Sequence, residues 1–205
     1  MKISLTDAGK RFNREWIFRH FTYQFEQGRS YAITGPNGSG KSTLLQILSG
    51  SMHFNEGLCQ WANDNKHLAN EQVYTNISIC APYLELVEEM TLNEFLEFHR
   101  EFKPFLPGFD AARIASILNL EKAAHKQIRY YSSGMKQRAK LGQCIFSNTP
   151  IVLLDEPCTN LDAEGIELYQ RLIADHCKER LVVVSSNDEV EYRFCGEKIV
   201  MSDYK

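Results

Sequence analysis

The sequence predicts an α/β fold with a parallel sheet core, an N-terminal antiparallel β part and an inserted helical subdomain. Three observations support this prediction: alternating apolar residues near the N-terminus, helix signals in the middle, and apolar strands alternating with helices after Pro150. Apolar residues make up 43% of the 205, enough for one substantial core, and no Pro/Gly/Ser-rich linker divides the chain. We therefore predict a single domain over residues 1–205, with the helical subdomain roughly at residues 84–146.

Near the N-terminus, apolar side chains alternate with others as they do in antiparallel strands. Ile3 and Leu5 form one such pattern, and Phe21, Tyr23 and Phe25 form a second. The turn sequence Gln27-Gly28 follows, after which a short apolar strand is predicted over Arg29–Thr34. The N-terminal part is therefore predicted to be antiparallel β structure.

The middle of the chain carries helix signals. Residues 91–94, TLNE, form a capping-box sequence in which Thr91 accepts from the Glu94 amide and Glu94 reaches back. The helix behind this cap is predicted to end before Pro104, with one side formed by Leu92, Phe95, Leu96 and Phe102. Asp110 is a second N-cap, followed by apolar Ile114, Ile117 and Leu118. The aromatic stripe is predicted to pack in the core rather than to form a docking surface.

Strand and helix patterns alternate in the last third of the chain. Strands are predicted at Ile151–Leu154, Leu181–Ser185 and Lys198–Ser202, and helices at Asp162–Cys177 and Glu189–Phe194. Continuously apolar strands alternating with helices indicate a parallel sheet covered on both faces. Ligands of such sheets bind at the carboxyl ends of the strands, where a glycine-rich loop and an acidic pair lie in this sequence.

The composition argues against several classes of protein. A net charge of −3 and a pI near 6.1 lack the basic footprint expected of a nucleic-acid-binding protein, so no nucleic acid partner is predicted. No run approaches the roughly 18 apolar residues of a membrane span, and the N-terminus lacks the apolar segment of a signal peptide. The six cysteines are scattered without ligand spacing, which favours unpaired thiols in a reducing cytoplasm.

The glycine-rich loop, GPNGSGKST, fits the phosphate-binding pattern GxxxxGK[ST] and lies between a predicted strand and a predicted helix. Its glycines let backbone amides wrap closely around a phosphate, and the helix N-terminus adds positive potential. Lys41 supplies a charge for the β- and γ-phosphates, and the Ser42 hydroxyl is a hard ligand for Mg²⁺. The predicted nucleotide-binding residues are Gly35, Pro36, Asn37, Gly38, Ser39, Gly40, Lys41, Ser42 and Thr43.

An acidic pair follows the apolar strand at Ile151–Leu154. Asp155 is predicted to hold Mg²⁺, directly or through water. Glu156 would face the opposite way and orient or deprotonate the attacking water. Such pairs are common on protein surfaces, but a pair that follows four apolar residues and precedes a proline is much less so. The sequence therefore predicts Asp155 as a metal ligand and Glu156 as a catalytic residue.

Three further features resemble the ATP-binding-cassette (ABC) ATPase family. Residues 131–138, YSSGMKQR, resemble the family's LSGGQ signature and lie between the phosphate loop and the acidic pair, where the family has it. Residues 159–162, TNLD, resemble its D-loop, which ends here at Asp162. Phe12 lies 29 residues before Lys41, where the family usually has an aromatic residue that stacks on adenine. The resemblance covers essentially the whole chain and implies trans contacts to ATP from Ser132, Ser133, Gly134 and Met135.

The resemblance implies a mechanism and partners. Two such domains would meet head to tail around two ATP molecules with Mg²⁺, as a homodimer or as a heterodimer with a second cassette. The leading hypothesis is an ATP-hydrolysing, energy-coupling subunit of an ABC transporter, cytoplasmic and held at the inner face of the membrane by a separate permease. The alternatives are a soluble ABC ATPase of translation or DNA repair, and a regulatory nucleotide-binding module with weak hydrolysis.

Three departures from the family pattern bear on the rate of hydrolysis. Asn187 stands where the family usually has a histidine, and asparagine cannot carry the proton or charge of an imidazole. Pro82 stands where it has a glutamine, and Glu85 is a speculative substitute. Ser133 replaces a signature glycine, and Met135 replaces the signature glutamine. We therefore predict MgATP binding with slow hydrolysis, with Asn187 as a catalytic candidate; an ordinary loop asparagine is the alternative.

Overall fold

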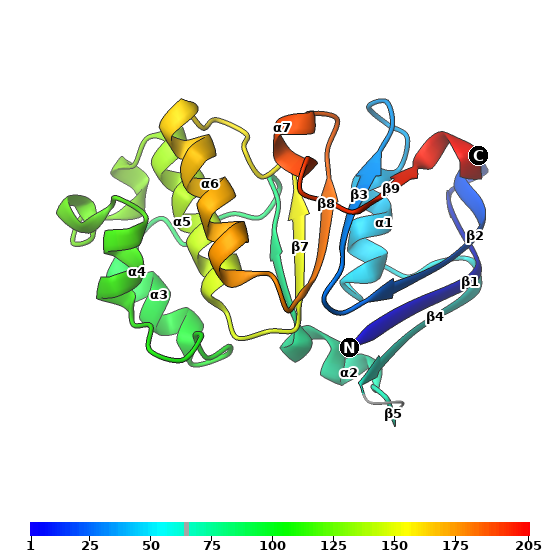
Figure 1. The fold of residues 1–205 in the computed structure, drawn as a ribbon, viewed down its shortest axis with the longest axis horizontal. Helices are drawn as coiled ribbons and strands as arrows, with labels where there is room; N and C mark the ends of the chain where they lie inside the picture. Colours follow the sequence, from blue (N-terminus) through cyan, green and yellow to red (C-terminus); the bar gives the residue numbers. More distant parts are fainter. Residues whose placement is uncertain (64–65) are drawn as a thin grey trace. The chain divides into compact units, whose positions relative to one another are not determined.

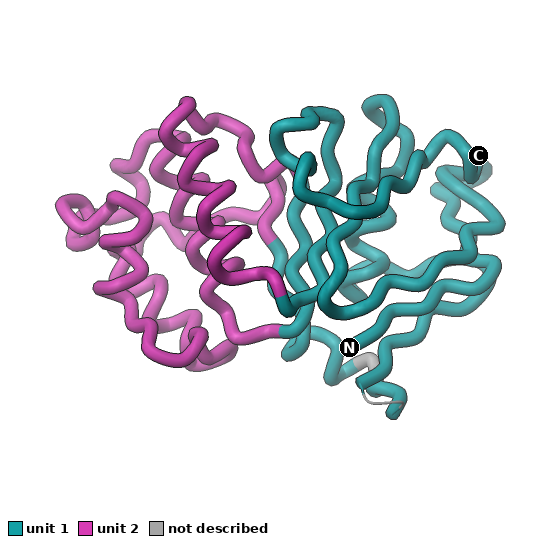
Figure 2. The backbone as a smooth tube through the Cα atoms, viewed as in Figure 1, with its two compact units in different colours: residues 1–79, 150–155, 179–205 teal, residues 80–149, 156–178 magenta. Residues whose placement is uncertain are grey.

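The computed structural model describes residues 1–63 and 66–205, which fold as two compact units (Figure 2). The first unit comprises Met1–Ile79, Pro150–Asp155 and Glu179–Lys205, and the second comprises Cys80–Thr149 and Glu156–Lys178. The helical subdomain predicted over residues 84–146 lies within the first segment of the second unit. One domain over residues 1–205 stays a prediction.

The first unit contains an antiparallel sheet in the order β2-β1-β4-β5 (Figure 1). Ile3 pairs with Phe25, and Leu5 pairs with Tyr23, which confirms the predicted N-terminal strands. The sequence did not predict β4 or β5. The strands are β1 (Lys2–Phe12), β2 (Glu15–Glu26), β4 (Glu56–Asn63) and β5 (Lys66–His67).

The same unit contains a five-stranded sheet in the order β6-β7-β8-β3-β9, within which β7, β8, β3 and β9 run parallel (Figure 1). This confirms the predicted α/β class with its parallel core. The strand predicted over Lys198–Ser202 is displaced toward the N-terminus, because residues Met201–Tyr204 form a 3₁₀ turn. The strands are β3 (Ser30–Thr34), β6 (Ile77–Cys80), β7 (Ile151–Asp155), β8 (Leu181–Ser185) and β9 (Glu197–Val200).

The core of the first unit lies around α1 (Lys41–Leu48). Alternate residues of the parallel strands, Ile33, Leu153 and Val183, are fully buried there with apolar side chains of α1 such as Leu44 and Leu45. Because successive side chains of a strand point to opposite faces, every second residue of these strands faces α1. The same alternation determines which face of the sheet the polar residues at the strand ends, Asp155 and Ser185, project to.

The second unit contains four longer helices, α3 (Leu92–Arg100), α4 (Ala111–Ile117), α5 (Ser133–Phe146) and α6 (Ala163–His176). The capping box is present, since the Thr91 amide donates to Glu94 Oε2 at 2.8 Å and the Glu94 amide donates to Thr91 Oγ1 at 3.3 Å. Asp110 caps α4 by accepting from the Arg113 amide at 2.7 Å. Both predicted N-caps are confirmed.

The prediction that the aromatic stripe packs in the core is wrong for one of its residues, Phe102. Leu92, Phe95 and Leu96 are buried as expected, but Phe102 is 61% exposed and packs edge-on against Phe98, with ring centroids 5.1 Å apart. The helix ends at Arg100, so the 3.6-residue periodicity that would place Phe102 on the buried side stops before that residue. The short helices α2 (Asn70–Val73) and α7 (Glu189–Tyr192) complete the fold, and α7 ends earlier than the predicted Phe194.

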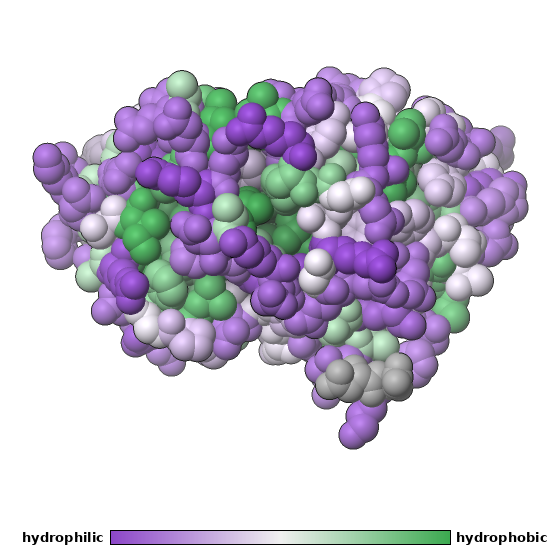
Figure 3. All heavy atoms as spheres, in the orientation of Figure 1, coloured by the Kyte–Doolittle hydropathy of each residue, from purple (hydrophilic) through white to green (hydrophobic). Residues whose placement is uncertain are grey.

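Among the described residues, no helix is both long enough and apolar enough to cross a lipid bilayer. On the face drawn in Figure 3, hydrophilic side chains predominate and apolar atoms gather in separate small patches. Isolated apolar side chains of this kind are normal on a protein surface.

His99 makes the second unit sensitive to acid. Its Nε2 contacts Ser147 Oγ at 2.8 Å, and Gln143 Nε2 donates to its Nδ1 at 3.0 Å, which suits a neutral imidazole. Burial, with a smaller contribution from Lys103, lowers the pKa of His99 from 6.5 to about 4. The unfolded chain therefore binds the proton more readily, and stability present above about pH 6.5 is lost as the pH falls toward 4. Thermal melting at pH 7 and pH 4.5 should show a larger loss for wild type than for His99→Gln, and equal losses would contradict this origin.

Candidate functional site

The carboxyl ends of three parallel strands lie in one row of the sheet. Asp155 at the end of β7 is in register with Ser185 at the end of β8, and Ser185 is in register with Ile33 of β3. The Ser186 amide extends this row by donating to the Ile33 carbonyl at 3.1 Å. The segments that follow β3, β7 and β8 therefore leave the sheet at the same edge, which is where α/β proteins bind ligands.

The predicted phosphate loop connects β3 to α1 at this edge. Its Gly40, with φ near 100°, precedes the first residue of α1, and a Cβ there would lie 2.5 Å from Cγ2 of Ile17. Only glycine fits this left-handed conformation and this close approach. Ile17 of β2 thus packs against the loop at the point where α1 begins. The first backbone amides of a helix have no partner within the helix, which suits an anion.

Lys41 is the first residue of α1, and it curls back over the loop. It is only 6% exposed, and its Nζ donates to the carbonyl oxygens of Gly35 at 2.8 Å and Pro36 at 3.4 Å. These contacts hold the ammonium group against the first two residues of the loop. Ser42 and Thr43 follow on α1 and are partly exposed. A buried positive charge in a glycine-rich loop, whose backbone amides can also donate, suits a polyanion such as a chain of phosphates.

Asp155 fits the chemistry of a metal ligand. It is 2% exposed, and its Oδ1 has no hydrogen-bond partner in the part of the chain that the structure describes. Asp155 lies two residues after Leu153, so its side chain projects on the face that carries α1, and α1 packs against β7. An unpaired carboxylate oxygen is costly in a buried place unless a cation or a donor engages it. The donor set of Asp155 and the Ser42 hydroxyl suits Mg²⁺, a hard cation that prefers oxygen ligands.

Glu156 differs from its neighbour in exposure and in backbone conformation. It is exposed, whereas Asp155 is buried, so the two consecutive carboxylates have different environments. Its φ of 44° lies in the left-handed region that non-glycine residues rarely adopt. Strained backbone of this kind gathers at functional sites because surrounding structure must hold it in place.

Asn187 contacts the phosphate loop. The Gly35 amide donates to Asn187 Oδ1 at 3.2 Å, and Asn187 Nδ2 donates to Asn37 Oδ1 at 3.4 Å. The structure therefore brings Asn187 together with two predicted nucleotide-binding residues, although they are 150 or more positions apart in the chain. Its amide offers both a donor and an acceptor at the rim of the loop, and it stays neutral at every pH.

Phe12 lies in the first unit, at the end of β1. Its side chain is 46% exposed, and Lys10 Nζ lies 4.9 Å from the centre of its ring. Across the β1–β2 ladder it pairs with Glu15, two positions before the Ile17 side chain that touches the phosphate loop. The ring is therefore exposed on the strand pair that also carries Ile17, and its stacking role stays a prediction.

The predicted signature residues lie at the start of α5, in the second unit. Ser132 is the N-cap, and its Oγ accepts from the Met135 amide at 3.3 Å. A Cβ on Gly134 would lie 3.1 Å from the Asn160 carbonyl oxygen, so the glycine lets that loop pass closely. Ser132 and Ser133 are exposed and Met135 is partly buried. The exposed N-terminal end of a 14-residue helix is a second place suited to an anion.

Two other predicted positions have local structural partners. Asp162 caps α6, since its Oδ1 accepts from the Gly165 amide at 2.9 Å. Pro82 offers only its carbonyl oxygen, which accepts from Lys140 Nζ at 3.2 Å. Glu85 shares a cavity of about 400 Å³ with Lys136 and Lys140.

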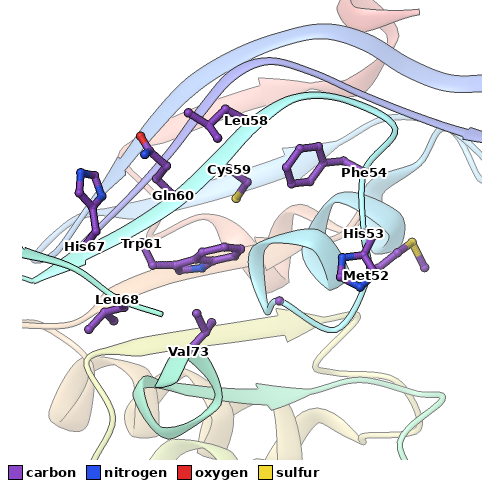
Figure 4. Close-up of a pocket in the computed structure, with 11 residues that line it drawn as sticks. Met52, His53, Phe54, Leu58, Cys59, Gln60, Trp61, His67, Leu68 and Val73 are labelled. Atoms are coloured by element: carbon purple, nitrogen blue, oxygen red, sulfur yellow. The ribbon is translucent and has the colours of Figure 1, made fainter. Parts of the chain in front are cut away.

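A cavity of about 390 Å³ in the first unit is separate from these residues (Figure 4). Its walls combine apolar and aromatic side chains, such as Phe54 and Trp61, with His53 and His67. The indole of Trp61 donates to the Leu48 carbonyl at 2.9 Å, which anchors this wall to α1. None of the predicted nucleotide-site residues lines the cavity.

Ser185 also lies at the carboxyl edge of the parallel sheet, although the sequence did not single it out. Ser185 is completely buried beside Asp155, and its Oγ has no hydrogen-bond partner among the described residues. The signal was present, because a hydroxyl follows four apolar strand residues at the carboxyl end of a predicted strand. Its pairing with Asp155 could not be read from a single strand, since neighbours in a sheet are set by the tertiary fold.

Together, the glycine loop, the buried lysine and the strand-end aspartate define a P-loop nucleotide-binding protein. A family model described as "ABC transporter" matches residues 18–159. The match covers more than half of the chain, so the chain belongs to the ABC transporter family. It is an ATP-binding cassette and an ATPase of that family.

Similar proteins cover nearly the whole chain. The cytochrome c biogenesis ATP-binding export protein CcmA of Haemophilus influenzae is 28% identical, over 100% of this chain and 97% of its own length. The uncharacterized ABC transporter ATP-binding protein YybJ of Bacillus subtilis is 27% identical, over 92% of this chain and 86% of its own length. A dimeric bacterial ABC transporter cassette has a TM-score of 0.82 at 23% identity, covering 97% of this chain and 93% of that one. That likeness shows the same fold.

Proposed function

We propose that this cassette binds ATP at the phosphate loop and hydrolyses it to drive a membrane transporter. The observation that carries the proposal is Lys41, whose ammonium group is held by the Gly35 and Pro36 carbonyls inside the loop. On binding, the β- and γ-phosphates would take over that ammonium group and the backbone amides of the loop. The exposed ring of Phe12 would stack on the adenine.

The proposed metal ligands are the Ser42 hydroxyl and the Asp155 carboxylate. A Mg²⁺ ion held there would neutralise negative charge on the phosphates. Asp155 Oδ1 supports this assignment because it is buried and has no partner within the described protein. The Asp155 side chain projects on the α1 face of the sheet, where it could bind the ion through its free oxygen.

Glu156 is the proposed general base. It follows the proposed metal ligand directly, is exposed, and has a left-handed backbone conformation. A carboxylate in this place can accept a proton from the water that attacks the γ-phosphate. The proton leaves the water oxygen as that oxygen bonds to phosphorus, and the bond from phosphorus to the ADP oxygen breaks.

The working state is proposed to be a dimer, in line with the dimeric cassette that shares this fold. Ser132 to Met135 of one subunit would donate to the γ-phosphate held by the other, because the α5 N-terminus is exposed and favours anions. The D-loop at Asp162 would lie at the same interface. A second copy of this chain or a different cassette could complete the pair.

A separate permease is proposed as the membrane partner, which would place this chain on the cytoplasmic face. Exposed apolar side chains of the second unit, Tyr83, Leu84 and Val87, lie in the segment just after Pro82 and offer a surface for it. CcmA relatives are named as export proteins, which supports export as the direction. Purification of the tagged chain from gently solubilised membranes should bring a polytopic membrane protein with it. Recovery of the chain without one, with the ATPase intact, would favour a regulatory module.

Slow hydrolysis is the expected consequence of Asn187 and Pro82. Asn187 hydrogen-bonds the loop but offers no titrating group, and Pro82 offers no side-chain donor. We expect Asn187→His to raise the steady-state rate of phosphate release several-fold, with Asn187→Ala as the control for loss of the loop contact. Fast wild-type turnover that Asn187→His leaves unchanged would contradict this. The same two residues favour the second candidate, a regulatory nucleotide-binding module whose hydrolysis is weak.

A further inference from the structure

Ser185 lies at the centre of the carboxyl edge of the parallel sheet. It ends β8, and its backbone is in register with Asp155 on one side and with Ile33 on the other. Side chains of residues in register on parallel strands project to the same face of the sheet. Val183, two residues earlier, is buried on the α1 face, and so is Leu153. The Ser185 hydroxyl and the Asp155 carboxylate are therefore neighbours on the face from which α1 begins.

Both groups are buried with an unused oxygen. Ser185 is 0% exposed and Asp155 is 2% exposed, and neither Ser185 Oγ nor Asp155 Oδ1 has a hydrogen-bond partner among residues 1–63 and 66–205. A buried hydroxyl without a partner destabilises the folded state, and natural proteins rarely leave one without a reason. The four preceding residues of β8 are all apolar, so a valine would have suited this position better if packing were its only role.

The next residue shows what a structural serine looks like at this edge. Ser186 is also buried, at 2% exposure, but its Oγ accepts from the Asp188 amide at 2.9 Å just before α7. Its hydroxyl is therefore explained by the fold alone. The hydroxyl of Ser185 is not, although the two serines are consecutive and equally enclosed.

We infer that Ser185 is a positioning residue of the nucleotide site, which holds the Asp155 carboxylate in place for the metal ion. The inference rests on the proposed function of Asp155 as a metal ligand. The two oxygens have no direct hydrogen bond, so one water molecule that accepts from the hydroxyl and donates to the carboxylate would join them. Partners in this outer position orient a ligating carboxylate and tune the affinity of the metal.

Metal affinity is the readout that separates this role from a structural one. We expect Ser185→Ala to weaken Mn²⁺ binding about 10-fold in the presence of a non-hydrolysable ATP analogue, measured from the free-ion signal in electron paramagnetic resonance. Its affinity for the analogue in EDTA should match that of wild type. Its melting temperature without ligand should be close to that of wild type, because the hydroxyl makes no direct hydrogen bond within the described protein. Ser186→Ala is the matched control and should lower the melting temperature while leaving Mn²⁺ affinity unchanged.

Two results would overturn the inference: Mn²⁺ affinity of Ser185→Ala within twofold of wild type, or a loss of analogue binding in EDTA as large as the loss in Mn²⁺. Asp155→Ala distinguishes this failure from failure of the proposed site. If Asp155→Ala loses Mn²⁺ binding and Ser185→Ala does not, only the role of Ser185 is wrong. If neither variant changes Mn²⁺ binding, the metal site itself is misplaced, and the role of Ser185 falls with it.

Discussion

Glu156→Gln is expected to lower the rate of ATP hydrolysis about 1,000-fold, within the range usual for loss of a general base, while the Kd for MgATP stays within about threefold of wild type. Glutamine has nearly the same size and can still orient a water molecule, but it cannot take up the proton. Because the side chain is exposed, the substitution should leave the melting temperature unchanged. Single-turnover phosphate release and equilibrium binding measure the two effects separately.

The matched control is Glu167→Gln, an exposed glutamate on α6 that has no proposed part in the site. It should hydrolyse ATP at the wild-type rate. A Glu156→Gln protein with turnover within tenfold of wild type would show that another group accepts the proton. Glu85, which shares a cavity with Lys136 and Lys140, would then be the next residue to substitute.

Lys41→Met should weaken binding of MgATP by about 100-fold or more and remove hydrolysis with it. The substitution keeps the apolar stem of the buried side chain but removes a cation that would make charge-assisted hydrogen bonds to two phosphates, at about 1.5–3 kcal/mol each. Adenosine, which has no phosphate, should bind both proteins equally weakly. Isothermal titration with ATP and with adenosine separates the contribution of the phosphates to the binding affinity from that of the nucleoside.

Lys41→Arg serves as the control for charge alone. Arginine keeps the positive charge but is too large and too rigid for the contacts to Gly35 and Pro36, so an intermediate loss is expected. Unchanged ATP affinity in Lys41→Met would mean that ATP binds elsewhere. The cavity beside Trp61, which none of the phosphate-loop residues lines, is the alternative location to examine.

Local signals in the sequence identified most of the elements correctly. The Thr91 capping box, the Asp110 cap and the strand before the phosphate loop depend on residues within a few positions of one another, and the structure has all three. The phosphate loop was equally readable, because its glycines are required by backbone conformations such as that of Gly40. The sequence pattern therefore predicts those elements whose conformation is determined by interactions between neighbouring residues.

The features that escaped prediction depend on tertiary contacts. In β4, the alternation of buried Cys59 and Trp61 is obscured by the apolar but exposed Leu58, so the strand was not recognised. Phe102 matched a helical period that ended two residues before it. The partners of Ser185 lie on strands that are distant in sequence. Sheet order and side-chain environment, rather than propensity, decided these cases.

The central claim is that Lys41, Asp155 and Glu156 form a metal-dependent ATPase, and phosphate release from ATP by the purified protein tests it most directly. Wild type should release phosphate slowly but measurably with Mg²⁺. Release should fall to background in EDTA and in Lys41→Met, Asp155→Ala and Glu156→Gln. Phosphate release by wild type that persists at the same rate in EDTA and in all three variants would contradict the account.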